Sequence, residues 1–260
     1  MKNFLILILL SCTTTFFAQT SNNELIISQK TAGGAGWSSA KPLEILIFGN
    51  GGLKQTVTGS STEDNPATGS LGASFVVKGR SELTVGFTIN KLNATSISDS
   101  KDFGSNLLIP DLEGISFTLT GTRYFNDKIG IYGEILVANS KWEIDSIEYN
   151  ASPVALKLGA NIAPFGDLSR GPNFITFSFF AGYSNRSLIG NITNKDNVRK
   201  QYFGTEKTSF HGLEVGANLI LNKTKFFINI PVLFGKDKID NLTGGQVNIG
   251  VTISGDLLKL

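Results

Sequence analysis

The alternation of apolar and polar residues along the chain is the feature that most restricts its fold. From Ile115 to Thr122 the sequence reads ISFTLTGT, with Ile, Phe and Leu at alternate positions and hydroxyl-bearing residues between them. The same pattern recurs at 83–90, 129–138 and 154–162. A period of two residues is typical of a β-strand with two different faces, whereas an amphipathic helix repeats at about 3.6 residues. The sequence therefore predicts an all-β fold.

Segments with this alternation, each about 8 to 12 residues long, predict about ten strands. They cover 43–49, 71–79, 82–91, 114–125, 128–139, 153–164, 174–184, 211–222, 224–234 and 246–254. No segment has the helical spacing of a crossover connection, so the strands should run antiparallel, up and down. Connections at one end should be short turns, and those at the other end long and polar. The long ones span 50–70, 92–113, 140–152 and 185–210.

The composition of the polar face indicates which side of the strands points outward. A face in water carries many Lys, Glu, Asp and Arg residues, but only 17% of this chain is charged, against about 25% in soluble domains. The polar positions are mainly Gly, Ser, Thr and Asn. We therefore expect the polar face to line a crowded interior and the apolar face to contact lipid. Phe125, Tyr183, Phe226 and Phe234, near strand ends, would form aromatic girdles.

An even number of strands, with long loops at one end and short turns at the other, resembles the small outer-membrane β-barrel proteins of Gram-negative bacteria. The resemblance covers residues 40–255 approximately. It implies a closed, up-and-down antiparallel transmembrane β-barrel in the cell outer membrane, surrounded by outer-membrane lipids and with both termini in the periplasm. The C-terminal segment Asp256–Leu260 lacks the aromatic last residue with which such barrels often end.

The first residues predict an export signal. Lys2 precedes an uninterrupted apolar run, Phe4–Leu10, which suits a secretory signal and is much shorter than the about 20 residues of a membrane-spanning helix. Cleavage after Ala18 is one interpretation, and lipidation at Cys12 is the other. The expected domains are residues 1–18 as signal peptide, 19–42 as a periplasmic N-terminal segment and 43–260 as the barrel.

Several kinds of chemistry are disfavoured by what the chain lacks. Cys12 is its only cysteine and His211 its only histidine, so a zinc site with several His or Cys ligands is not expected. The neighbours of His211, Ser209 to Leu213, include no carboxylate. The 23 Lys and Arg residues nearly balance 21 Asp and Glu and form no basic stripe for nucleic acid. We expect no cofactor, no metal and no catalytic site.

Charged residues inside the predicted strands are scarce and fall in phase with the polar face, and Glu44, Glu134, Lys157 and Glu214 should all point into the lumen. We expect them to form a structural polar network in the lumen, where charges must be paired or hydrated. Glu134 and Lys157 lie on consecutive strands and should form an ion pair. A ten-stranded barrel is close to the size whose interior side chains fill. A plugged lumen is therefore expected, and a narrow conduit or lumenal binding site is the alternative.

Two of the long loops offer contacts with partners. The 185–210 loop carries more cations than acids and could meet lipopolysaccharide phosphates at the outer surface. Its cations are Arg186, Lys195, Arg199, Lys200 and Lys207. The loop from Asn139 to Ser152, which contains Trp142, is acidic and aromatic and could either pack on its neighbour or bind a protein partner.

The sequence thus predicts a non-enzymatic outer-membrane barrel with a structural, partner-binding or minor transport role. Two alternatives stay open. One is an outer-membrane hydrolase that uses His211, which would need a carboxylate or serine beside the imidazole. The other is a secreted soluble β-barrel that binds a ligand, which would leave the membrane fraction without detergent.

Overall fold

Most of the residues that the computed structural model describes lie in β-strands. The described residues are 43–58, 61–64, 68–77, 81–89, 95–100, 103–104, 107, 115–166, 168, 175–221, 224–235, 239, 242–245 and 247–259. The long strands are β1 (Leu43–Thr58), β3 (Thr68–Val77), β4 (Ser81–Ile89), β6 (Ile115–Tyr124), β7 (Ile129–Ile144), β8 (Ile147–Phe165), β9 (Ile175–Ile189), β10 (Ser209–Leu221), β11 (Thr224–Phe234) and β13 (Val247–Lys259). Residues 1–42, which hold the predicted signal peptide and N-terminal segment, lie outside the described residues.

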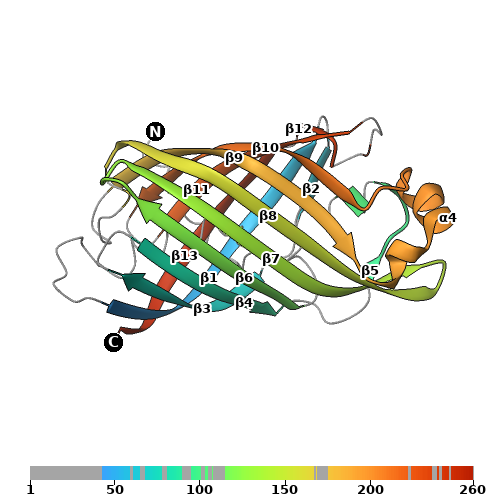
Figure 1. Ribbon diagram of the computed structural model, residues 1–260, viewed down its shortest axis with the longest axis horizontal. Coiled ribbons are helices and arrows are strands. Elements are labelled where there is room, and N and C mark those ends of the chain that lie inside the picture. Colours follow the sequence, from blue (N-terminus) through green and yellow to red (C-terminus); the bar gives the residue numbers. More distant parts are fainter. Residues whose placement is uncertain are drawn as a thin grey trace, which may run out of the picture.

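The remaining elements are short. They are the strands β2 (Ser61–Asp64), β5 (Thr95–Ser96) and β12 (Gly244–Gly245) and the helices η1 (Asn191–Asn194), α4 (Asp196–Val198) and η2 (Arg199–Phe203). The three helices follow one another between β9 and β10 (Figure 1). No helix in the described part of the chain has the length and hydropathy needed to cross a membrane.

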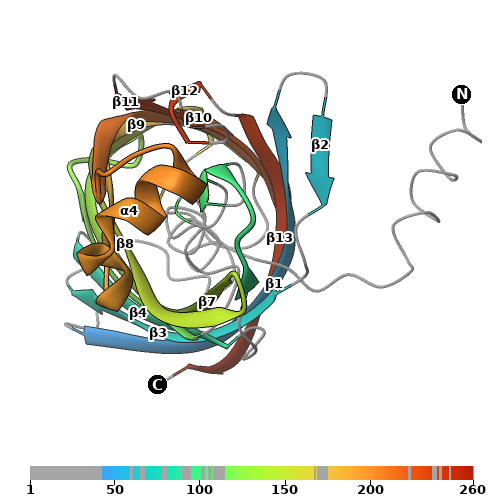
Figure 2. The ribbon, with the colours of Figure 1, turned by 90° about the vertical axis from the view of Figure 1, so that its right-hand side faces the viewer.

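Long strands that follow one another in the chain pair antiparallel, from β1–β3 through to β10–β11. β11 pairs with β13, and β13 pairs with β1 from Leu46 to Val57. Each of the long strands thus has two long neighbours, and Figure 2 shows them curving around a common interior. The prediction of an all-β, antiparallel, up-and-down architecture is confirmed.

The two faces of the strands differ as their alternation predicts. In β6 the side chains of Ser116, Thr118 and Thr120 are buried, while the intervening Phe117 is 47% exposed. The predicted girdle residues Phe125, Tyr183, Phe226 and Phe234 are all exposed. The apolar face therefore points outward and the polar face points into the interior.

The prediction of a long loop at 140–152 is wrong, because most of this segment is β-strand. β7 and β8 stay paired up to Ile144 and Ile147, joined by Asp145 and Ser146 alone. Both turn residues have positive φ, 51° and 62°, as in the two-residue turns whose twist matches that of paired strands. The hairpin therefore extends beyond its neighbours, since β6 begins opposite Asn139 and β9 ends opposite Ser152.

Two other predicted loops are also partly regular structure. β1 continues to Thr58 and pairs with β2, so the segment 50–70 is largely strand. β9 continues to Ile189 before η1 begins. At the opposite end the turns are short as expected. In the turn between β6 and β7, Asn126 Oδ1 accepts hydrogen bonds from the backbone N–H groups of Lys128 and Ile129.

Candidate functional site

A charged cluster lies on the inward face of the strands. Glu134 in β7 and Lys157 in β8 are opposite one another in register, and Lys157 Nζ lies 3.6 Å from Glu134 Oε1. Lys157 Nζ also donates to Glu214 Oε1 of β10 at 2.8 Å. All three residues are buried. The contact predicted between Glu134 and Lys157 is present, and Glu214 is the nearer partner of the lysine.

Two residues that the sequence analysis did not select for the lumen complete this cluster. Arg186 Nη2 in β9 lies 3.3 Å from Glu214 Oε2, and Asn229 Nδ2 in β11 donates to Glu214 Oε1 at 2.7 Å. Two carboxylates and two cations therefore balance one another, as buried ions require. The cluster joins five neighbouring strands, β7 to β11. Asn229 falls in the polar phase of its predicted strand, so the phase rule could have found it.

Glu44, the fourth predicted member, is not placed in this cluster. It lies in β1 opposite Val76 of β3, and its side chain is outside the described residues. The structure therefore brings together three of the four predicted residues.

Glycines allow the interior to fill around the charges. Gly159 and Gly182 face one another across β8 and β9, and a Cβ on Gly182 would come within 2.4 Å of the carbonyl oxygen of Leu158. Gly216 in β10 is opposite Phe180 in β9, and a Cβ there would come within 2.4 Å of the phenyl ring. The ring can lie over the strand only because this position has no side chain. Backbone and ring thus occupy interior space that larger residues would contest.

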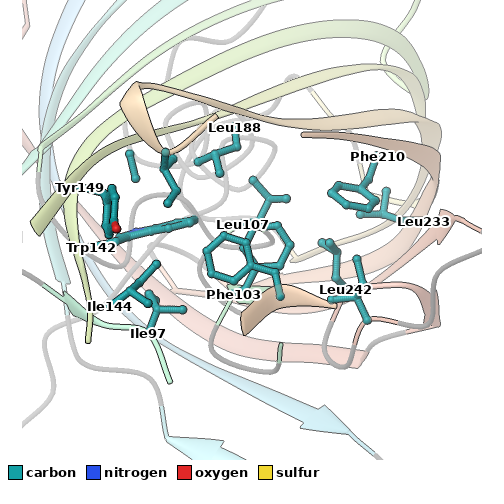
Figure 3. Packing of buried hydrophobic residues seen from close by; sticks show 14 residues of the cluster. Ile97, Phe103, Leu107, Trp142, Ile144, Tyr149, Leu188, Phe210, Leu233 and Leu242 are labelled. Carbon is teal, nitrogen blue, oxygen red and sulfur yellow. The ribbon is translucent and has the colours of Figure 1, made fainter. Parts of the chain in front are cut away.

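An apolar cluster lies next to the charged cluster, toward the end of the barrel that carries the helices (Figure 3). Phe103 stacks on Phe203 with ring centroids 4.2 Å apart, and Trp142 meets both rings edge-on at 5.9 Å. The members of this apolar cluster are Ile97, Phe103, Leu107, Trp142, Ile144, Tyr149, Ala151, Leu188, Ile192, Phe203, Phe210, Leu233, Ile239 and Leu242. The sequence analysis placed Trp142 in a surface loop, whereas it is fully buried.

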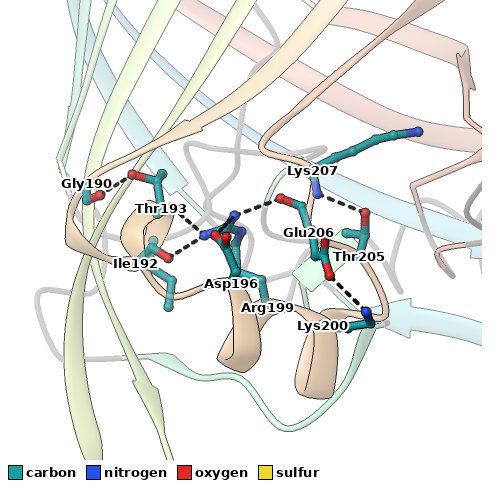
Figure 4. Close-up of polar contacts among 9 residues, drawn as sticks. All are labelled: Gly190, Ile192, Thr193, Asp196, Arg199, Lys200, Thr205, Glu206 and Lys207. Atoms are coloured by element: carbon teal, nitrogen blue, oxygen red, sulfur yellow. Dashed lines mark hydrogen bonds and ion pairs between the residues drawn. The ribbon is translucent and has the colours of Figure 1, made fainter.

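The segment between β9 and β10 is organised around Arg199, whose side chain is buried (Figure 4). Its Nη1 donates to the carbonyl oxygens of Ile192 and Thr193. Its Nη2 donates to Asp196 Oδ1 and to the carbonyl oxygen of Glu206, both at 2.7 Å. One guanidinium therefore ties η1, α4 and the chain before β10 together.

The two arginines of the 185–210 loop do not face outward, so they are not placed to meet lipopolysaccharide phosphates. Arg186 points into the interior toward Glu214, and Arg199 is enclosed by its own loop. Lys195 and Lys200 are exposed, and Lys200 Nζ pairs with Glu206 Oε1 at 2.9 Å. The hydrogen bond from Lys200 to Glu206 raises the pKa of the lysine.

His211 lies on the outward face of β10 and is exposed. Its ring lies between those of Tyr183 and Phe234, with centroids 6.5 and 6.4 Å away. Ser209 shares this face, but its hydroxyl contacts Asn185 and Ser187. Within the described residues no hydrogen bond or ion pair joins His211 to a serine or an acidic side chain. Nor do any three His, Cys, Asp or Glu side chains there gather as a metal site would require.

Comparisons with known proteins find similar structures and no sequence relatives. No family model matches the chain, and no curated protein matches it. The NanC porin is 8% identical over 81% of this chain and 98% of its own, with a TM-score of 0.43. LpxR from Salmonella typhimurium is 9% identical over 81% of this chain and 99% of its own, with a TM-score of 0.34. Ail, the attachment invasion locus protein of Yersinia pestis, is 12% identical over 82% of this chain and 99% of its own, with a TM-score of 0.30.

Proposed function

We propose that this chain is a non-enzymatic outer-membrane protein that spans the bilayer as a closed ten-stranded β-barrel with a plugged lumen. The observation that carries the proposal is that the apolar side chains point outward and the charged ones point inward. Ile131 and Ile135 in β7 are 44% and 45% exposed, while Glu134 beside them is 2% exposed. A wall of exposed apolar side chains around buried charges is unfavourable in water and favourable in lipid.

The height of the apolar wall supports a bilayer as its surroundings. Its outward residues on β7 run from Ile129 to Val137, and the next outward positions are Asn139 and Lys141. At about 3.3 Å per residue the apolar stretch is about 26 Å long. With the strand tilt of about 35 to 45° typical of such barrels, it rises about 20 Å, close to their usual apolar band of about 25 Å.

Closure of the barrel is supported by the pairing of its first and last strands. β1 and β13 are paired along most of their length, and β10 and β11 pair from His211 to Leu221. A bilayer-spanning sheet needs this continuity, because an open edge would leave backbone N–H and C=O groups without partners in lipid.

A non-enzymatic role is supported by the surroundings of His211 and of the buried carboxylates. His211 faces outward between two aromatic rings, and Glu134 and Glu214 each form an ion pair with Lys157. The hydrolase alternative would require the imidazole to meet a carboxylate or serine as acid–base partner. The charged cluster instead suits a structural role that fixes the register of β7 to β11.

Lipids are the first partners that this proposal implies. Outer-membrane lipids would cover the apolar wall, and lipopolysaccharide phosphates could meet the exposed Lys195, Lys200 and Lys207. Because Arg186 and Arg199 are turned inward, the lysines alone would provide that contact.

Fractionation followed by an unboiled gel tests the proposal. The protein should stay in the membrane pellet after washes with salt and urea, and should leave it only with detergent. In detergent, the unboiled sample should migrate differently from the boiled one, because a closed barrel has every strand paired. Recovery in the soluble fraction would instead favour the secreted soluble barrel.

A further inference from the structure

Several buried polar groups of the interior point to water inside the barrel. Hydroxyl and amide oxygens on four strands have no protein partner among the described residues. They are Ser116 Oγ, Thr120 Oγ1, Thr122 Oγ1, Ser184 Oγ, Asn218 Oδ1 and Asn229 Oδ1. Buried polar atoms that lack protein partners are normally satisfied by ordered water. Ordered water around the charged cluster would satisfy these atoms.

The apolar cluster lies between the charged cluster and the end of the barrel that carries the helices. Its rings come from the wall, in Trp142 and Phe210, and from segments folded between the strands, in Phe103 and Phe203. Figure 2 looks into the barrel from this end and shows α4 over part of the opening, on the side of β8 and β9. A dry, close-packed layer of this kind opposes the passage of water and ions.

The part of this layer that comes from the segment between β9 and β10 depends on Arg199. Phe203 and Ile192 belong to the apolar cluster, and both lie in helices that the Arg199 guanidinium connects. η1, α4 and η2 are too short to be stable alone. The buried Arg199 guanidinium binds the carbonyl oxygens of Ile192 and Thr193 in η1 and of Glu206 beyond η2, and so holds the two ends of the segment together.

We propose that the plug of the lumen can move and that this protein is a gated conduit for small polar solutes and ions, in which the segment from Gly190 to Thr208 is a lid that Arg199 holds shut. The proposal rests on the membrane barrel proposed above. In the closed state, Phe203 of the lid stacks on Phe103 and completes the apolar cluster. When the lid leaves, the interior around Lys157 and Glu214 becomes continuous with the outside.

Conductance of the full-length protein in planar lipid bilayers, with potassium chloride as the probe, tests the lid. Arg199→Met removes the guanidinium and keeps an unbranched apolar stem in the buried site. Phe203→Ala removes a ring of the apolar cluster and leaves Arg199 in place. Lys200→Met is the matched control, because it removes the neighbouring exposed cation of the same segment, whose pair with Glu206 is on the surface.

The unmodified protein and Lys200→Met should be closed for most of the recording. Arg199→Met and Phe203→Ala should raise the open fraction at least about tenfold, which corresponds to about 1.4 kcal/mol. Insertion is checked first by the difference between boiled and unboiled samples on a gel. If Arg199→Met does not insert, Phe203→Ala decides.

Two outcomes would overturn the lid. One is an unmodified protein that is already open, and the other is an inserted Phe203→Ala variant as closed as Lys200→Met. Failure of the unmodified protein to insert at all would contradict the membrane barrel itself, so the two proposals fail in different ways.

Discussion

Along β7 the outward side chains change from Ile131 and Ile135 to Asn139 and Lys141, while the inward ones change from Glu134 to Trp142. β8 changes in the same way. One part of these strands, which we call the band, has charges inside and apolar groups outside. The part beyond it, the extension, has aromatic groups inside and charged groups outside, as soluble proteins do.

This reversal shows that apolar–polar alternation identifies two different faces of a strand but does not indicate which face points to the interior. The surroundings decide that. Apolar groups turn away from water in the extension, whereas in lipid the outward face must be apolar and the polar groups gather inside. The proposed membrane barrel accounts for both patterns, since it places lipid around the band and water around the extension beyond Asn139 and Ser152.

The largest difference between the two parts should appear when a lysine is removed from each. Lys157→Met leaves Glu134 and Glu214 buried with less opposite charge, which should lower the free energy of unfolding by about 3 to 5 kcal/mol. Lys141→Met removes an exposed pair with Glu148 in the extension, which is worth about 0 to 1 kcal/mol. Urea unfolding in detergent micelles or vesicles measures both. Equal losses would contradict the burial of the band's interior.

A double substitution sharpens this comparison. Adding Glu134→Gln to Lys157→Met removes one of the carboxylates left in excess, so the double variant should recover part of the loss. Strictly additive losses would show that the two side chains do not interact.

Aromatic packing should matter in the extension and much less on the outside of the band. Trp142→Ala should cost about 3 to 4 kcal/mol, toward the lower end for a large buried side chain, because the cluster lies near one end of the barrel. Ile135→Ala should cost far less, since lipid tails replace the lost contacts. Both are measured by denaturant unfolding. A larger loss for Ile135→Ala would place the core on the outer side of the strands.

Charge on the outward face should be tolerated beyond the band only. Ile131→Arg should cost about 2 to 4 kcal/mol if the side chain lies near the middle of the bilayer. Asn139→Arg, outward on the same strand, should change the free energy of unfolding by no more than about 0.5 kcal/mol. Similar effects at both positions would remove the boundary between band and extension.

The smallest expected effect is a change in the pKa of Tyr202, in the contact between the lid and the β7–β8 hairpin. Tyr202 donates a hydrogen bond to the Asp145 carboxylate at the tip of the extension, and this contact raises the pKa of the tyrosine above its usual value. The contact is therefore complete at neutral pH and is lost only as the pH rises through the raised pKa. The phenolate absorbance difference between the chain and Tyr202→Phe measures it. Asp145→Asn should bring the pKa of Tyr202 back down, and an unchanged pKa would exclude the contact in solution.

The strands that stay within one solvent were predictable from the sequence. β11 coincides with the predicted segment 224–234, and β6 differs from its prediction by one residue at each end. The extension of β7 and β8 was predicted to be a loop because its apolar residues lie on the other face of the strands. Beyond Asn139 the apolar residues, Trp142 and Tyr149 among them, are on the inward face and no longer on the outward one. A search for a single apolar face therefore ends the strand too early, although β7 and β8 remain paired.

The candidate site was predictable in the same measure. Counting alternate positions brought Glu134, Lys157 and Glu214 to one face, as the structure has them. Arg186 was missed because the predicted strand ended at residue 184. The role of Arg199 could not be predicted, because its acceptors are mostly backbone carbonyls of a chain that turns without periodicity.

The boundary between band and extension can be located directly with nitroxide labels on the outward face. In a Cys12→Ser background, one label is placed by Ile131→Cys in the band and another by Asn150→Cys in the extension, and the protein is reconstituted in lipid vesicles. Collisions with molecular oxygen, which dissolves in lipid, are compared with collisions with a water-soluble nickel chelate. The label at position 131 should meet oxygen and be shielded from nickel, and the label at position 150 should show the reverse. Equal access of the nickel chelate to both labels would contradict a membrane-spanning band.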